Sequence, residues 1–373
     1  MTRQLLVVAG EVSGDMHAGN LVHELRSLEP RLVAFGIGGE RLEASGLELT
    51  GRTEELSHMG LVEVLRELPR IRQVMQRILE ECSRRRPALA VLVDSPDFNL
   101  RLAARLKKLG IPVVLYVSPQ LWAWRRGRVR TVRHVAREVL CILPFEVAFY
   151  LRHGVPARYV GHPLIDEVAR LDLLEHPVDR VERRLGLLPG SRGMEIRQLL
   201  PTMIEALRRI PSTAVTDAVL VEAPGVGRVV DEVLGTLQPE PRVRRVRGEK
   251  RRTDLASCSL AWTASGTATL ECALLGVPMI VGYRLQPLSY AVARLLVRVP
   301  HVALANLIAR RRAFPELIQG HWSPKRLCET TAELLVGDGE QARADLELVR
   351  SRLGGPGASR RAAEAVLEHL AEV

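Results

Sequence analysis

The sequence predicts an α/β protein made of two Rossmann-like, doubly wound domains that face a cleft. Short apolar runs alternate with amphipathic stretches of helical length, which indicates a parallel sheet with helices on both faces. The alternation loosens near the middle of the chain and then starts again, and a length of 373 residues fits two domains better than one core. Ligands of such sheets bind at the carboxyl ends of the strands.

The first half of the chain contains six apolar runs that we expect to be strands, at 5–9, 32–37, 88–94, 112–117, 138–143 and 158–160. Apolar residues with helical spacing lie between them, at 18–28, 61–85, 100–109, 129–136 and 146–153. Residues 163–184 are charged and contain two prolines, so we interpret them as a linker.

Alternation then resumes with expected strands at 185–188, 218–222, 243–246, 260–263 and 278–282. Two helical stretches around 354–357 end the chain. The predicted domains are therefore 1–168 and 182–352.

The composition limits the class of protein. The net charge is +10, and lysine contributes only Lys107, Lys108, Lys250 and Lys325 to it. A basic surface suits phosphates, anionic lipid headgroups or nucleic acid. No run of 18 apolar residues is present, so we expect no membrane-spanning helix. The five cysteines lack CxxC spacing, which argues against a zinc site and favours a reducing cytosol.

Several common catalytic signatures are missing from the sequence. No glycine is followed by lysine, so there is no P-loop, and Arg41 replaces the last glycine of a dinucleotide fingerprint after Gly36. There is no GxSxG, HExxH or Asp-x-Asp sequence either. These absences argue against the commonest classes of ATPase, dehydrogenase, serine hydrolase and zinc enzyme, and we expect no bound metal or cofactor.

Three polar motifs follow expected strands of the first domain. Glu11 and Ser13 lie in a glycine-flanked turn that can face an anion, although Asp15 could simply cap a helix there. Asp97, in the run DSPDFN, could accept a proton from a hydroxyl nucleophile or cap the next helix. The run SPQLWAW is followed by several arginines, and indole rings and guanidinium groups suit sugars and phosphates.

Two turns of the second domain also suit an anion. Gly190, Ser191 and Arg192 close its first strand and open a helix, so they can bind a pyrophosphate or form a plain capped turn. The second turn, with Glu271 one helical turn later, contains the small residues Ser265, Gly266 and Thr267. Two such turns in one domain favour a nucleoside diphosphate. By spacing alone, Asn306 and the run FPELIQ are uninformative.

Taken together, these segments resemble the lipid-A-disaccharide synthase family. The likeness is ordered and covers most of the chain, through the segments GEVSGD, FGIGG, SHMG, DSPDFN, SPQLWAW, ILPFE, VGHP, LPGSR, SGTATLE and FPELIQ. It implies a GT-B fold with an acceptor-binding first domain, a UDP-sugar-binding second domain, and a C-terminal helix at 357–373 that packs back on the first domain. It also implies an inverting transferase that joins UDP-2,3-diacylglucosamine to 2,3-diacylglucosamine-1-phosphate and releases UDP.

The resemblance implies a role for individual residues. Asp97 becomes the general base, Arg192 and Asn306 serve catalysis or donor binding, and Glu11 and Ser13 line the acceptor side. The residues implied in substrate or UDP binding are Gly190, Ser191, Ser265, Gly266, Thr267, Glu271, Glu316 and Gln319.

Diacylated substrates stay in a bilayer, so we expect peripheral contact with inner-membrane lipid on the cytoplasmic face. The apolar residues Leu61, Val62, Val64, Leu65 and Leu68 are flanked by arginines, which is typical of an interfacial element or of a core-facing helix side. Another UDP-sugar enzyme of the GT-B class is the nearest alternative. A nucleic-acid-binding protein is less well supported, because the basic run 242–252 has no interleaved aromatic residues.

Overall fold

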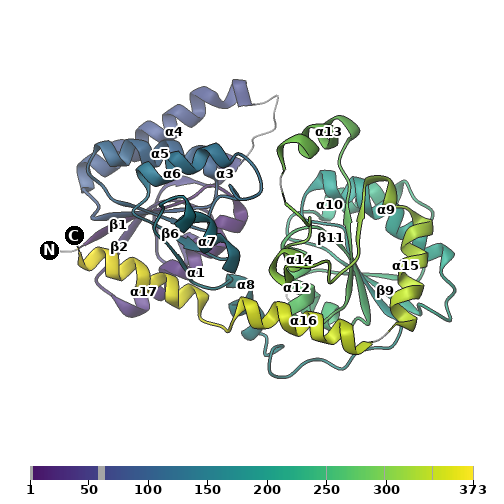
Figure 1. The fold of residues 1–373 in the computed structure, drawn as a ribbon. Coiled ribbons are helices and arrows are strands. Elements are labelled where there is room, and N and C mark those ends of the chain that lie inside the picture. The colour runs from purple at the N-terminus through teal and green to yellow at the C-terminus, as the bar shows by residue number, and fades with distance from the viewer. Residues whose placement is uncertain (1–2, 58–63, 249, 298, 338, 373) are drawn as a thin grey trace. The chain divides into compact units, whose positions relative to one another are not determined.

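The computed structural model describes residues 3–57, 64–248, 250–297, 299–337 and 339–372. The chain divides into two compact units, residues 1–166 with 355–373, and residues 167–354. Figure 1 shows that each unit contains a sheet with helices on its faces.

The first unit is built on a seven-stranded parallel sheet of order β3-β2-β1-β4-β5-β6-β7. Its strands are β1 Gln4–Ala9, β2 Val33–Gly38, β3 Glu48–Arg52, β4 Leu89–Val93, β5 Val113–Tyr116, β6 Glu138–Cys141 and β7 Ala157–Tyr159. The helical segments of this part of the chain are α1 Val12–Leu28, α2 Glu40–Ala44, α3 Glu54–Ser57, α4 Val64–Arg85, α5 Pro96–Lys108, η1 Arg126–Arg128, α6 Val129–Val135, α7 Pro144–Arg152 and α8 Pro163–Ala169.

The second unit contains a six-stranded parallel sheet of order β10-β9-β8-β11-β12-β13. Its strands are β8 Arg184–Leu188, β9 Asp217–Val221, β10 Val243–Val246, β11 Leu260–Ala264, β12 Met279–Tyr283 and β13 Glu316–Ile318. Its helical segments are α9 Gly193–Arg209, α10 Gly227–Gly235, α11 Lys250–Ala256, α12 Thr267–Leu274, α13 Pro287–Leu296, α14 Leu304–Ala309, η2 Gln319–His321, α15 Pro324–Val336 and α16 Gly339–Leu353.

The central strands are buried along most of their length. From Leu5 to Ala9 every residue of β1 is fully buried, as are Leu89, Ala90 and Val91 of β4. A parallel strand covered by helices on both faces needs such a continuous apolar run, which is why these strands could be recognised in the sequence. In the second unit the indole of Trp262 is also fully buried and donates to Thr331 Oγ1 at 2.9 Å.

Strands β3 and β13 and helix α8 are among the elements that the sequence analysis did not predict. The edge strand β3 is partly exposed and polar, and β13 has only three residues, so neither forms an apolar run. The expected linker at 163–184 begins instead with helix α8, Pro163–Ala169, whose Leu164, Ile165 and Val168 are buried. The prolines misled the interpretation, because Pro163 occupies the first turn of α8, where a missing backbone N–H costs nothing.

The last helix, α17 Ala358–Ala371, belongs to the first unit and packs on α1 (Figure 1). Asp166 caps it: the Asp166 carboxylate accepts hydrogen bonds from the backbone N–H groups of Gly357, Ala358 and Ser359 at 2.6–3.1 Å. A carboxylate at a helix N-terminus satisfies unpaired donors and opposes the helix dipole.

The residues expected to contact a membrane are only partly described. Leu61 and Val62 lie outside the described residues. Helix α4 includes the backbone of Val64, Leu65 and Leu68, whose side chains also lie outside the description. No helix among the described residues is long and apolar enough to cross a membrane.

Candidate active site

Three motifs of the first unit meet at one edge of its sheet. Strands β1, β4 and β5 are neighbours, and the register pairs Ala9 with Val93 and Val93 with Tyr116. The turns after these three strands therefore begin at the same level, at the carboxyl edge where α/β sheets bind ligands.

The turn between β4 and α5 has an unusual backbone. Asp94 and Ser95 both adopt a left-handed conformation, with φ of 52° and 44°. The Asn99 side chain steadies the turn, because its Nδ2 donates to the carbonyl oxygens of Val93 and Asp94 at 3.1 and 2.7 Å. Two successive non-glycine residues in this conformation are strained, and such strain is often found at functional sites.

Gly10 of the first motif lies against this turn. A Cβ at Gly10 would lie 2.5 Å from Ser95 Oγ, so no larger residue fits without movement. The Ser13 hydroxyl lies 3.5 Å from Asp94 Oδ2, which links the first and second motifs. Both Glu11 and Ser13 are exposed at the start of α1, where a substrate could reach them.

Asp15, in contrast, is structural. Its buried carboxylate accepts hydrogen bonds from the backbone N–H groups of Gly39, Arg41 and Leu42, at 2.6, 3.0 and 3.2 Å. Asp15 therefore caps α2 and not the helix that contains it. This arrangement explains the FGIGG segment as well, since a Cβ at Gly39 would lie 2.7 Å from Asp15 Oδ2.

Asp97 lies in the first turn of α5 and is accessible. About half of its side chain, 53%, is exposed. Arg125 Nη1 lies 3.3 Å and Arg128 Nη2 2.5 Å from Asp97 Oδ1. The N-cap position of α5 belongs to Ser95, so capping does not account for Asp97. A solvent-facing carboxylate next to two guanidinium groups can accept a proton in an environment that also attracts phosphate.

The segment that carries these arginines is attached to α7 through Glu146, which sequence reasoning did not single out. Glu146 is buried and accepts hydrogen bonds from Ser118 Oγ at 2.8 Å and Trp122 Nε1 at 3.0 Å. Burial raises the pKa of the Glu146 carboxyl to about 7, against the hydrogen bonds that it accepts. The run ILPFE contained this residue, but a glutamate in a helix N-terminus does not reveal burial by its sequence.

In the second unit the two expected anion-binding turns are also adjacent. Strands β8 and β11 are paired, with Leu188 opposite Thr263. Gly190 has a φ of 116°, and a Cβ there would lie 2.4 Å from Glu195 Oε2. The same carboxylate oxygen accepts a hydrogen bond from the Ser191 N–H at 3.2 Å. This turn is therefore compact and leads directly into α9.

Arg192 is the most accessible of the expected site residues whose side-chain exposure can be compared. Its side chain is 77% exposed, and Nη1 lies 3.4 Å from Glu195 Oε1. Tyr283, at the end of β12, lies within electrostatic reach of both groups: burial and Glu195 raise the pKa of Tyr283, and Arg192 opposes this rise. The guanidinium can thus reach a ligand at the carboxyl edge of the sheet.

The second turn supports the segment that precedes α14. Gly266 has a φ of 121°, and open space surrounds the position that a Cβ would occupy. Ser265 Oγ donates to the carbonyl oxygen of Val302 at 2.6 Å, and Thr269 Oγ1 accepts from the Ala305 N–H at 3.2 Å. The backbone of Gly266 and Thr267 remains at the start of α12, where an anion could bind.

Asn306 and Glu316 are buried and bind each other. Asn306 has no exposed surface, and its Nδ2 donates to Glu316 Oε1 and to the Phe314 carbonyl oxygen, both at 2.9 Å. Glu316 also accepts hydrogen bonds from the backbone N–H groups of Val302 and Ala303. These contacts shape the backbone around α14, and they leave Asn306 no exposed surface and Glu316 only 8% exposed.

Glu271 is held inside the second unit by arginine. Arg252 Nε lies 2.7 Å and Arg251 Nη2 3.7 Å from Glu271 Oε1, and Arg252 also pairs with Glu167. Glu271 is only 8% exposed. Its expected contact with ribose hydroxyls is therefore limited to the small part of the carboxylate that remains accessible.

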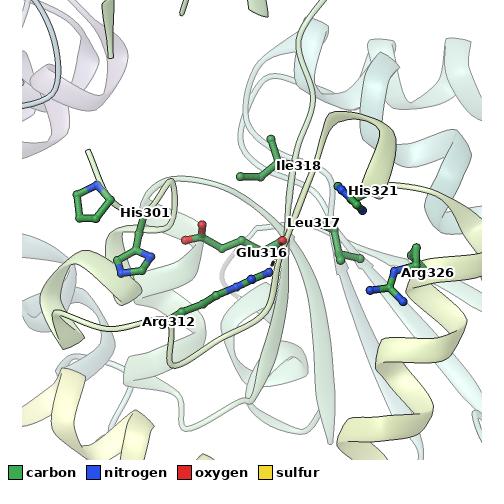
Figure 2. A pocket seen from close by; sticks show the side chains of 8 residues that line it. His301, Arg312, Glu316, Leu317, Ile318, His321 and Arg326 are labelled. Atoms are coloured by element: carbon green, nitrogen blue, oxygen red, sulfur yellow. Dashed lines mark hydrogen bonds between the residues drawn. The ribbon is translucent and has the colours of Figure 1, made fainter. Parts of the chain in front are cut away.

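Two pockets border β13 and the residues that follow it. The first has a volume of about 440 Å³, and Figure 2 shows His301 and Arg312 on one side of Glu316 and His321 and Arg326 on the other. Arg312 Nη2 donates to the Glu316 carbonyl oxygen at 2.9 Å. Two arginines and two histidines make this pocket suitable for an anion.

The second pocket, of about 360 Å³, lies after β12 and β13 and includes Gln198 and Arg284. Gln319 is part of its lining and exchanges two hydrogen bonds with the backbone of Leu285, at 2.8 and 3.2 Å. Sequence reasoning missed Arg284, because no glycine-rich or capping pattern surrounds it. Among the described residues, no group of three or more His, Cys, Asp or Glu side chains is placed to hold a metal ion.

Comparison with known proteins decides the family. The family described as "Lipid-A-disaccharide synthetase" matches residues 5–368. The chain belongs to the lipid-A-disaccharide synthase family. It is 45% identical to the lipid-A-disaccharide synthase of Myxococcus xanthus, over 98% of this chain and 97% of the relative. The synthase of Anaeromyxobacter dehalogenans is 47% identical with the same coverage. Members of this family are glycosyltransferases of lipid A biosynthesis, and this chain is an enzyme of that kind.

Solved structures with low sequence identity share the fold. A Staphylococcus aureus MnaA–UDP complex matches with a TM-score of 0.68 at 12% identity, covering 100% of this chain and 98% of that chain. MurG of Acinetobacter baumannii matches with a TM-score of 0.61 at 13% identity, covering 99% and 100%. These likenesses confirm the predicted α/β architecture of the GT-B class for the synthase family member described here.

Proposed function

We propose that this enzyme joins UDP-2,3-diacylglucosamine to 2,3-diacylglucosamine-1-phosphate. The products are the β-1,6-linked lipid A disaccharide 1-phosphate and UDP, with inversion at the donor C1. The full-length match to the lipid-A-disaccharide synthase family is the observation that supports this most strongly. The exposed Asp97 carboxylate, next to two arginines at a ligand-binding sheet edge, supplies the chemistry that the transfer needs.

On the acceptor side, Asp97 takes the proton of the 6-hydroxyl while that oxygen attacks C1 of the donor. The attack occurs on the face opposite to the leaving UDP, which inverts the configuration. Arg125 and Arg128 are suited to attract the acceptor phosphate, since guanidinium groups bind phosphate oxygens in pairs. Glu11 and Ser13 are exposed nearby and can orient the sugar.

On the donor side, leaving-group charge develops on the UDP diphosphate. Arg192 is the proposed cation for that charge, together with the backbone N–H groups of the turn that contains Gly190 and Ser191. Ser265, Gly266 and Thr267 form the second cradle. Helix N-termini and arginine stabilise an anion without a metal ion, so the mechanism includes none.

The remaining donor residues have less direct roles. Gln319 borders the second pocket, whose lining also includes Gln198 and Arg284, side chains that can hydrogen-bond a uracil ring. Glu271 is proposed to meet the ribose through its small accessible part. We assign Asn306 and Glu316 a positioning role, because their side chains are buried against each other and hold the backbone before α14.

The lipid substrates imply that the enzyme works on the cytoplasmic face of the inner membrane. The apolar residues 61–68 and their flanking arginines are the proposed contact, a hypothesis that rests on the sequence pattern alone. Val64→Ser with Leu65→Ser should weaken binding to vesicles that contain anionic lipid. Unchanged vesicle binding by the folded variant would exclude this contact.

Mass spectrometry of reaction products tests the proposed function. Purified enzyme with both lipid substrates should give the disaccharide 1-phosphate and UDP. The parallel reaction with UDP-GlcNAc as donor should give no disaccharide. Turnover of UDP-GlcNAc alone, without use of the diacylated donor, would replace this proposal with that of an epimerase or a different sugar transferase.

A further inference from the structure

The buried carboxylate of Glu146 is placed to control the geometry around Asp97. Glu146 is 1% exposed, and all its recorded hydrogen-bond partners are donors. Ser118 and Trp122 donate to Oε1, and the Leu143 N–H donates to Oε2 at 3.1 Å. An ionised carboxylate accepts from all three donors at once, whereas an amide nitrogen accepts none and a protonated acid replaces one acceptor site with an O–H donor.

Two further side chains of α7 hold the same segment. Tyr150, one helical turn after Glu146, donates its hydroxyl to the Pro119 carbonyl oxygen at 2.9 Å. Phe145 packs edge-to-face on Trp122, with ring centroids 4.8 Å apart. Helix α7 therefore holds the start of the segment through Glu146, Tyr150 and Phe145.

The segment in question is residues 118–128, and its C-terminal end contacts Asp97 through Arg125 and Arg128. Val129 and Val132 of α6 are buried in the core, so the arginines between Trp122 and α6 lie on a stretch fixed at both ends. Within it, Arg125 has a left-handed φ of 54° and accepts the Arg128 N–H on its carbonyl oxygen at 2.9 Å. The position of Arg125 and Arg128 on Asp97 thus depends on where the Ser118–Trp122 turn is held.

We propose that Glu146 is a positioning residue for the transfer reaction, which acts on Asp97 through the segment 118–128 and its two arginines. This inference rests on the proposed function of Asp97. No contact between Glu146 and a substrate is required, because Glu146 is buried beneath the segment.

The ionisation of Glu146 gives this role a pH dependence. Three ionisable groups interact electrostatically with Glu146. They are Cys141 of β6, Tyr159 of β7 and Tyr150, which lies on the same helix as Glu146. Burial raises the pKa of all three, that of Tyr159 to about 12, so they stay protonated near neutral pH. Because the pKa of Glu146 is raised to about 7, the carboxyl is about half protonated at neutral pH, and each protonated molecule has lost one acceptor site. Activity should therefore rise with pH through about 7.

The test compares Glu146→Gln with Glu138→Gln. Glu138 is a matched control, because it is also a buried carboxylate of the first unit but binds Arg158 and His369 instead of the segment. We expect E146Q to lower kcat on the order of 10- to 100-fold with little change in the donor KM. E146Q should also remove the rise in kcat near pH 7. The control E138Q should keep the wild-type kcat and the wild-type rise in kcat with pH.

A spectroscopic measurement does not depend on turnover. In the wild-type protein the indole N–H resonance of Trp122 and the Nε–H resonances of Arg125 and Arg128 should titrate together near pH 7. E146Q should abolish this titration. If E146Q does not fold, Trp122→Phe removes one donor, keeps the carboxylate, and should lower kcat in the same direction.

The outcomes are separable. Wild-type kcat and an unchanged pH profile in folded E146Q would overturn the inference, as would an equal loss in E138Q. A wild-type enzyme that makes no disaccharide would overturn the proposed function instead, and the coupled titration of Trp122 and the arginines would still report on Glu146.

Discussion

Arg128 Nη2 lies 2.5 Å from Asp97 Oδ1, so the first turn of α5 is tied to the segment before α6 by an ion pair that faces solvent. Asp97 shares this environment with Arg125. Exposed ion pairs contribute little to stability, about 0–1 kcal/mol. Asp97 can therefore leave its arginine partners during the reaction with little loss in the free energy of unfolding.

Asp97→Asn should therefore separate activity from stability. We expect the transfer rate to fall on the order of 10²- to 10⁴-fold, because the amide cannot accept the hydroxyl proton. The melting temperature should change little, since more than half of the side chain is exposed. Product formation and thermal unfolding measure the two effects. Asp172→Asn is the control: Asp172 is also exposed and paired, with His176, and its loss should leave the rate unchanged. Normal turnover by D97N would remove Asp97 from the mechanism.

Arg192→Ala should also lower turnover strongly without unfolding the protein. Its side chain is 77% exposed, so its loss removes little packing. If it stabilises the leaving UDP, kcat should fall on the order of 10²- to 10³-fold. Arg197→Ala, one turn further along α9 and paired with Glu232, is the matched control and should retain activity. Equal rates for both variants would contradict the assignment.

Asn306→Ala should behave differently, as a stability variant. The substitution removes three buried hydrogen bonds, two donated by Nδ2 and one accepted from the Phe314 N–H. The buried Glu316 carboxylate then loses the donor that Asn306 supplies. We expect a loss of about 2–4 kcal/mol in the free energy of unfolding, measured by urea titration. A variant as stable as the wild type but inactive would show that Asn306 contacts substrate after all.

Gly10→Ala should destabilise the protein through Ser95. The new Cβ would lie 2.5 Å from Ser95 Oγ, an overlap that costs about 1–3 kcal/mol. Ser95→Gly removes that oxygen and also suits the φ of 44° at residue 95. The double variant should therefore recover most of the lost thermal stability. Additive losses in the double variant would mean that the two residues do not touch.

Glu146 predicts an unusual pH dependence of stability. Its pKa is about 7 in the folded protein against an ordinary value of 4.5, so between these values the folded state binds the proton more strongly. The free energy of unfolding should consequently fall as pH rises from about 4.5 to 7, by on the order of 3 kcal/mol from this group. Urea unfolding of wild type and E146Q at pH 5 and 7.5 measures it. Relative to the wild type, E146Q should have a higher free energy of unfolding at pH 7.5 than at pH 5. If the difference between the two proteins is the same at both pH values, the pKa of Glu146 is not raised by burial.

The central strands could be predicted because burial on both faces leaves a continuous apolar run, as in Leu5–Ala9. The two edge strands, β3 and β13, could not, since one is polar and the other has three residues. The order of strands is also invisible in a local pattern. The sheet, not the sequence, brings Gly10 next to Ser95 and places Asp97 beside the following strand's loop.

The structure shows which of the predicted site residues are accessible, and their roles stay predictions. Arg192 and Asp97 are exposed polar groups at strand ends, as expected. The resemblance implied roles for Asn306 and Glu316 in catalysis or substrate binding, but local spacing did not reveal that the two side chains are buried and hydrogen-bonded to each other. Glu146 was overlooked for the same reason, because its partners Ser118 and Trp122 lie more than twenty residues away in sequence.

The return of α17 to the first unit affects how the chain is made. Residues 167–354 leave the ribosome as one uninterrupted stretch, so the second unit has all its parts before translation ends. The first unit lacks the helix that packs on α1 until residues 355–373 emerge. Until then the face of α1 that α17 covers is exposed to solvent. The part of the enzyme synthesised first is thus the part completed last.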